Sequence, residues 1–200
     1  MKLHKFAAIF GGLALASSLS ACSITIDLGG LRPSRPPSVE VSGPTSEPPS
    51  TTGAADVLGP TGVGSLVLGM TKAEALRTGL VTGISGTKGM CGDDSDGRLA
   101  NAMPLNEYDM DGKLFFSAYT NKLILIGATS GLATPEGIQL GSSLNEVVRA
   151  YPTWEGDEEP TNGIGYVPVA DNPQAVYRIW VSDGMVTELG LQDINQDCYE

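Results

Sequence analysis

Cysteine and histidine carry much of the nucleophilic and metal-binding chemistry of proteins, and this 200-residue chain has three cysteines and one histidine. The histidine, His4, lies in a leading segment that has the character of a cleaved export signal. The mature protein would then have no imidazole for Ser-His-Asp catalysis, Cys-His catalysis or a histidine metal site. The sequence therefore predicts a protein that is not an enzyme and has no cofactor.

The leading segment begins with two lysines and an uncharged apolar run over residues 6–16. This run is shorter than the roughly 20 residues that a helix needs to cross a bilayer. Residues 19–22, Leu-Ser-Ala-Cys, resemble the lipobox of bacterial lipoproteins. The resemblance implies that residues 1–21 are a signal peptide and that Cys22 carries a lipid. An ordinary secretory signal with a chance cysteine is the alternative.

Lipid on Cys22 would fix the protein to the extracytoplasmic face of the cell membrane. A diacylglyceryl group supplies two acyl chains, which is enough for a stable anchor. Lys and Arg number 12 and Asp and Glu 23, so loss of the two lysines in residues 1–21 leaves a net charge of −13. This charge disfavours nucleic acid and anionic lipid headgroups as partners.

The other two cysteines, Cys91 and Cys198, form an even pair in an exported chain, which predicts a disulfide. It would close a loop of about a hundred residues, which the chain-entropy model values at roughly 4–5 kcal/mol. Two separate free thiols are the alternative.

The composition changes near residue 60. Residues 22–60 are rich in Pro, Ser, Gly and Thr and poor in large apolar side chains, which predicts a disordered tether behind the lipidated cysteine. Beyond it, residues 68–77 (LGMTKAEALR) match residues 140–149 (LGSSLNEVVR). We interpret this match as a duplication, with one helix-plus-sheet repeat over 61–128 and a second over 129–200. Chance similarity is the alternative.

Each matched segment predicts a short helix. Thr71 with Glu74, and Ser143 with Glu146, have the spacing of a capping box. In the second helix an apolar face is expected from residues with helical spacing: Leu144, Val147, Val148 and Tyr151.

Strands are predicted to follow each helix. The pairs are 114–119 with 123–126 and 176–181 with 185–191, the latter joined through a strong Asp183-Gly184 hairpin signal. Residues 103–105 match residues 167–169 and complete three antiparallel strands in each half. The predicted fold class is α+β, with two tandem units, each a short helix or helices packed on an antiparallel sheet.

This order of elements resembles the beta-lactamase inhibitory proteins, which have two tandem helix-plus-sheet units, and single units resemble small outer-membrane assembly lipoproteins of the BamE type. The most similar segment is GMTKAEA at 69–75. Together with the lipobox, the tether, TPEGIQLGSS at 134–143 and QDCYE at 196–200, it is also similar to actinobacterial envelope lipoproteins of unassigned function. The resemblance covers residues 64–200 and implies a fold rather than a chemical activity.

Two sets of side chains are candidate binding residues. Asp94, Asp96 and Gly97 fit part of a calcium loop, but Gly92 and Met103 occupy positions where that loop has carboxylates, so a solvated acidic loop is favoured. Exposed aromatic side chains mark contact surfaces, and Trp154, which follows a helix stop, is the main candidate.

Tyr166 is the second aromatic contact candidate, whereas Trp180 is expected in a strand and at least partly buried. We therefore expect a lipid-anchored module that binds an unknown protein of the cell envelope. The alternatives are a structural envelope-assembly lipoprotein and a carrier of a small ligand or calcium that uses the acidic loop.

Overall fold

The structure, a computed structural model, describes residues 57–106 and 109–198. The chain divides into two units, residues 1–46 and 47–200, and every described residue belongs to the second. Cys22 and the predicted signal peptide lie outside the described residues, as does nearly all of the predicted tether.

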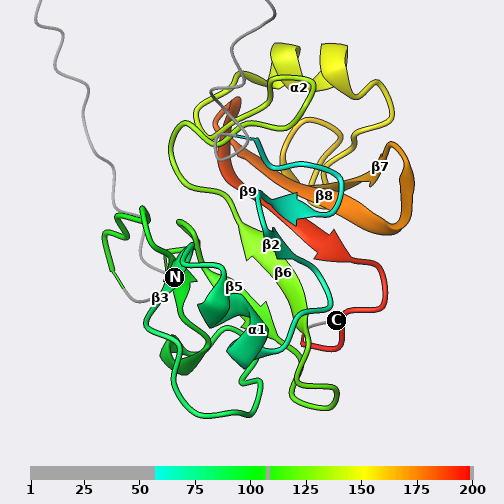
Figure 1. Cartoon of the computed structure of the whole chain (residues 1–200). Coiled ribbons are helices and arrows are strands. Elements are labelled where there is room, and N and C mark those ends of the chain that lie inside the picture. Colours follow the sequence, from blue (N-terminus) through cyan, green and yellow to red (C-terminus); the bar gives the residue numbers. More distant parts are fainter. Residues whose placement is uncertain (1–56, 107–108, 199–200) are drawn as a thin grey trace, which may run out of the picture. The chain divides into compact units, whose positions relative to one another are not determined.

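The central element is a five-stranded antiparallel sheet in the order β5-β6-β9-β8-β7 (Figure 1). Its strands are β5 Leu114–Phe116, β6 Leu123–Gly127, β7 Gly163–Val169, β8 Asn172–Ser182 and β9 Met185–Asp193. Two small ribbons accompany it: β1 Gly62–Val63 with β2 Leu66–Val67, and β3 Val81–Thr82 with β4 Arg98–Leu99. The fold combines helices and strands and consists mostly of strands, in agreement with the predicted α+β class.

Both predicted helices are present, as α1 Lys72–Arg77 and α2 Leu144–Ala150. Each begins with the predicted capping box. The backbone N–H of Thr71 donates to Glu74 Oε2 at 2.7 Å, and that of Ser143 donates to Glu146 Oε2 at 2.7 Å. The carboxylates thereby occupy amides that the first helical turn leaves without a partner.

The predicted strand pairs are also present, because β5 pairs with β6 and β8 pairs with β9. Asp183 and Gly184, which join β8 to β9, have φ values of 53° and 76°. A two-residue hairpin turn with positive φ at both positions matches the right-handed twist of the strands, and Asp-Gly favours that conformation.

The prediction of a strand at 103–105 is wrong, and the segment is an exposed loop. Met103 and Leu105 are 83% and 92% exposed. Their backbone amides donate to side chains, Met103 to Asp111 Oδ2 at 2.6 Å and Leu105 to Asp109 Oδ2 at 2.8 Å. These local bonds replace a strand ladder, and Pro104, between them, has no N–H to give.

The strands of the two predicted repeats form one continuous sheet, because β6 of the first pairs with β9 of the second. One hydrophobic core serves both halves and includes Ala75 of α1 and Val147 of α2. In Figure 1, α1 lies beside β5 and β6, and α2 lies at the opposite end of the sheet. Val148, expected on the apolar face of α2, is instead exposed.

Candidate functional site

The two faces of the sheet differ in burial. Along β7 and β8, residues alternate between buried side chains and half-buried or exposed ones, with the period of two that a strand imposes. The buried set belongs to the core shared with both helices, and its members include Val167, Tyr177 and Ile179. The other set points away from that core and leaves the opposite face of β7 and β8 partly exposed, whereas on β9 the same face is buried at Gly190 and Gln192.

The partly exposed face carries a cluster that we call the Tyr166 patch: Ile164, Tyr166, Arg178, Trp180 and Glu188. Pairing register aligns Ile164 with Trp180 and Glu188 in one row, and Tyr166 with Arg178 in the next. Tyr166 is 48% exposed, whereas the side chains of Glu188 and Arg178 are 20% and 11% exposed, and Ile164 and Trp180 are partly buried. Arg178 Nη1 lies 2.6 Å from Glu188 Oε2, so an ion pair joins the two rows between the apolar side chains.

The outer edge of β7 borders this patch and is partly closed to further strand pairing. Ile164 N donates to Asp157 Oδ1 at 2.7 Å, and Ile164 O accepts from Asp157 N at 3.1 Å. Two and four residues further along the same side lie Tyr166 and Pro168, and Pro168 has no N–H. The patch is therefore a face for side-chain contacts rather than an open template for a strand.

Trp154 is not a surface residue, so the prediction that it contacts a partner is wrong. It is 3% exposed, and its Nε1 donates to the carbonyl oxygen of Ile179 at 3.2 Å. The indole lies against Gly165, where an added Cβ would stand 2.3 Å from Nε1. The missing side chain of Gly165 leaves the space that the indole fills. Tyr166, one position on, keeps its predicted exposure.

Asp96, half of the weak calcium candidate, is an internal ion-pair partner. It is 0% exposed, and its Oδ1 lies 2.9 Å from Nζ of Lys72, which is 2% exposed. Its oxygens also accept from the backbone amides of Met90, Gly92 and Phe116. With its acceptor sites taken by four donors, Asp96 cannot ligate calcium in this arrangement, and Asp94 is left as one exposed carboxylate.

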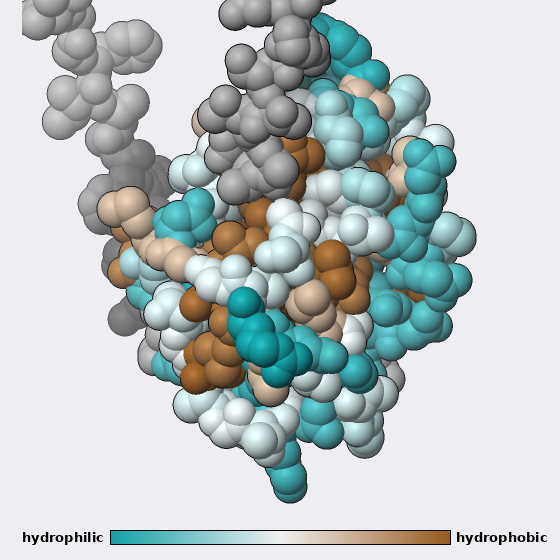
Figure 2. Space-filling view, viewed as in Figure 1, coloured by the Kyte–Doolittle hydropathy of each residue, from teal (hydrophilic) through white to brown (hydrophobic). Residues whose placement is uncertain are grey.

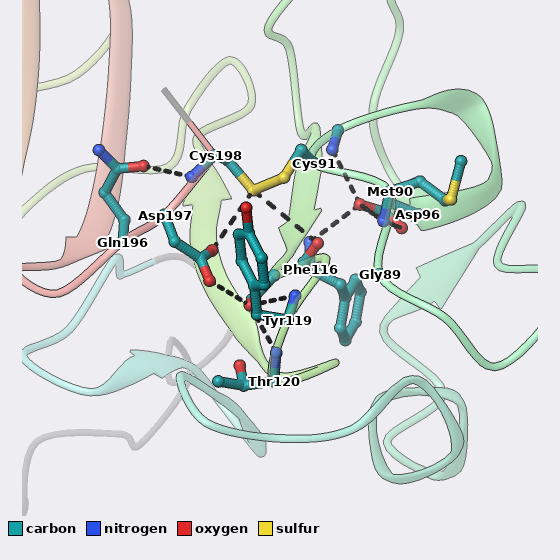
Figure 3. Close-up of a disulfide and its surroundings, with 12 residues drawn as sticks. Gly89, Met90, Cys91, Asp96, Phe116, Tyr119, Thr120, Gln196, Asp197 and Cys198 are labelled. Atoms are coloured by element: carbon teal, nitrogen blue, oxygen red, sulfur yellow. Dashed lines mark hydrogen bonds between the residues drawn. A yellow bond between two sulfur atoms is a disulfide. The ribbon is translucent and has the colours of Figure 1, made fainter. Parts of the chain in front are cut away.

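The predicted disulfide between Cys91 and Cys198 is present, with a Cα–Cα distance of 5.1 Å across 107 residues of sequence. Figure 3 shows it beside Asp197, whose Oδ2 accepts from Ser117 Oγ at 2.7 Å. Among the described residues, Cys91, Asp197 and Cys198 are the one group of close metal-binding side chains. Both sulfurs are bonded to each other, so the group offers no thiolate.

Two buried tyrosines have raised pKa values. Desolvation raises the pKa of Tyr151, whose Oη–H donates to Glu136 Oε2 at 2.5 Å, and Tyr151 Oη lies 2.8 Å from Thr134 Oγ1. Desolvation likewise raises the pKa of Tyr177, whose Oη–H donates to Leu58 O at 2.9 Å. Both phenols stay protonated and tie loops to the core. Neither has the depressed pKa that a nucleophile needs.

Two of the hollows on the described surface have lining residues that bear on binding. One, of about 230 Å³, is mainly apolar and includes Leu80, Leu99 and Leu132. The other, of about 450 Å³, includes Met103, Leu105 and two carboxylates, Asp109 and Asp111, that already accept backbone amides of their own loop. On the face that Figure 2 shows, apolar residues surface as separate brown patches rather than one continuous area.

No protein-family model, curated protein or solved structure matches this chain. Neither helix in the described part of the chain has the length and apolar character that a bilayer span requires. The site must therefore be interpreted from its own geometry, in which a partly exposed sheet face is the feature best suited to contact another molecule.

Proposed function

We propose that this chain is a lipid-anchored, extracytoplasmic, non-enzymatic module that binds a protein of the cell envelope. The lipobox-like sequence ending at Cys22 supports the anchor and the location. The lack of any histidine outside the proposed signal peptide supports the absence of catalysis by an imidazole.

The observation that carries the proposal is the Tyr166 patch. Tyr, Trp and Arg are among the residue types enriched at protein interfaces and their hot spots. Here Tyr166, Trp180 and Arg178 lie on neighbouring strands of a rigid sheet, so a partner would bind without ordering a loop. Arg178 and Glu188 supply polar contacts that fix the orientation of the partner.

Photocrosslinking in cells tests this assignment. A photoreactive phenylalanine derivative at position 166 should give one reproducible protein adduct. The same residue at position 119 is the matched control, because Tyr119 is an exposed tyrosine that lies outside the patch. Equal adducts from both positions would contradict the proposal. No adduct, together with altered envelope permeability in a deletion strain, would favour the structural-assembly alternative.

We also propose that the two halves of the described chain derive from one duplicated unit, as in the folds that the sequence resembles. The segment before each helix bonds in the same way to the second strand of the following hairpin. Gly69 N donates to Leu123 O at 2.8 Å, and Gly141 N donates to Val186 O at 2.8 Å. Equivalent placement of a glycine, a capped helix and a strand supports common descent of the halves.

A further inference from the structure

A continuous series of contacts connects the disulfide to α1. Cys91 lies between Met90 and Gly92, whose backbone amides donate to Asp96 at 3.0 Å and 2.8 Å. Asp96 in turn pairs with Lys72, the first residue of α1. Figure 3 shows the start of this series, with Cys91, Met90 and Asp96 side by side. The covalent bond to Cys198 therefore anchors the residues that hold a buried ion pair.

Apart from Ile84, which is partly buried against the core, polar contacts and the disulfide hold this loop in place. All of residues 82–98 are described, and no apolar side chain among them is buried. The buried members are three glycines and Asp96. Lys72 Nζ donates to Ser85 O at 3.0 Å and to Ser95 O at 2.8 Å, so the loop closes around the cation through polar contacts. A segment with so little apolar burial has low local stability once these contacts are lost.

Two features of the closed loop are costly. Cys91 has a φ of 52°, in the left-handed region that residues other than glycine seldom occupy. Such a conformation persists where the surroundings over-determine it. The Lys72–Asp96 pair also loses hydration, which its mutual attraction offsets only while the surrounding hydrogen bonds keep the geometry. Both features favour opening when the covalent tie is removed.

The loop covers an edge of the sheet. β5 is the terminal strand, and its outward-pointing backbone groups are bonded to the segment that contains Cys91 and Asp96. Leu114 N donates to Gly97 O at 3.1 Å, and Phe116 N donates to Asp96 Oδ2 at 2.9 Å. Phe116 O accepts from Cys91 N at 3.0 Å. Displacement of residues 89–97 would leave β5 without these partners.

We propose that the Cys91–Cys198 disulfide is a redox-sensitive latch: its reduction opens the loop at residues 85–97, separates Lys72 from Asp96 and uncovers the β5 edge, while the sheet stays folded. The reductant is a dithiol. One of its thiolates attacks a sulfur of the disulfide to form a mixed disulfide, and its second thiol resolves that bond. The dithiol becomes a disulfide, and two electrons and two protons pass to the protein as two thiols.

Hydrogen exchange on the whole mature protein in detergent, before and after reduction with a dithiol, tests the latch. We expect the amides of Met90, Gly92 and Phe116 to exchange at least about tenfold faster after reduction, as in local opening. The amide of Ile179, in the core of β8, should keep its protection. Amine acetylation gives a second readout, in which Lys72 becomes reactive on reduction while the exposed Lys88 reacts in both states.

The variant Asp96→Asn separates the ion pair from the disulfide, and it should expose the same amides although the disulfide is intact. If this variant does not fold, the comparison of oxidised and reduced wild-type protein still tests the proposed latch. The proposal is wrong if thiol alkylation proves full reduction and Lys72 remains unreactive. It is also wrong if Ile179 loses protection together with Met90, because the disulfide would then support the whole fold rather than one loop.

Discussion

Gly127 of β6 and Gly190 of β9 are register partners at the junction between the two hairpins of the sheet. Their surroundings differ in spite of this pairing. A Cβ at position 127 would stand 2.5 Å from the carbonyl oxygen of Met110, whereas a Cβ at position 190 would meet nothing closer than 3.2 Å. The loop that carries Met110 lies over the sheet at β6 and leaves β9 less covered.

This asymmetry predicts different costs for the same substitution. Gly127→Ala should lower the free energy of unfolding by about 1–3 kcal/mol, because the backbone of another segment must move. Gly190→Ala is the matched control and should cost less than about 1 kcal/mol. Urea denaturation of both variants measures the difference. Equal losses would contradict the close approach of Met110 to β6.

The two capping boxes predict a stability loss in acid. The backbone amide of each N-cap residue donates to the carboxylate and lowers the pKa of Glu74 and of Glu146 below the ordinary value of 4.5. A carboxyl whose pKa is depressed by folding stabilises the protein above its unfolded pKa, and that contribution is lost as pH falls through the folded pKa.

Melting temperature measured between neutral pH and about pH 3 checks this sign. The double variant Glu74→Gln, Glu146→Gln should show a smaller fall than the wild type over the acid range. The N-cap hydroxyls offer a companion test at neutral pH, since Thr71→Ala and Ser143→Ala should each cost about 1 kcal/mol. An unchanged acid slope in the double variant would show that other carboxyls dominate.

Trp154 and Tyr166 should respond in opposite ways to truncation. Trp154→Ala removes a buried indole and its hydrogen bond to Ile179, so we expect a loss of about 3–5 kcal/mol in the free energy of unfolding. Tyr166→Ala should change that free energy by less than about 0.5 kcal/mol, because its side chain is half exposed. If Tyr166→Ala also abolishes an adduct formed from a photoreactive residue at position 180 of the same patch, the role of Tyr166 is recognition and not folding.

The proposed anchor is tested at Cys22. Cys22→Ala should move the protein from the membrane fraction to the soluble fraction, since no acyl chain could then be attached. Mass spectrometry of the wild-type protein should find a lipid on the peptide that begins at Cys22. Full retention of the variant in membranes would refute the anchor.

Local patterns predicted the elements that depend on neighbouring residues. The capping boxes at Thr71 and Ser143 and the Asp183-Gly184 turn are set by bonds within a few residues, and the structure contains all three. The disulfide was predicted from the pair of cysteines that remains if the chain is exported and Cys22 carries a lipid. Tyr166 is exposed because strand alternation places it on the face opposite the core.

Other features required knowledge of the three-dimensional packing. The burial of Trp154 depends on Gly165, eleven positions away, whose missing side chain receives the indole. Asp96 is one more carboxylate in an acidic run, and no sequence spacing identifies Lys72 as its partner across 24 positions. Residues 103–105 form a loop instead of the predicted strand, because the side chains of Asp109 and Asp111 accept hydrogen bonds from their backbone amides.

The backbone groups on the outer edge of β7 affect how the protein associates with itself at high concentration. Asp157 occupies both backbone groups of Ile164, and Pro168 further along offers no donor. A neighbouring copy arriving there would find too few free groups to extend the ladder. At high local concentration, copies of the protein should therefore resist growing into fibrils from this side.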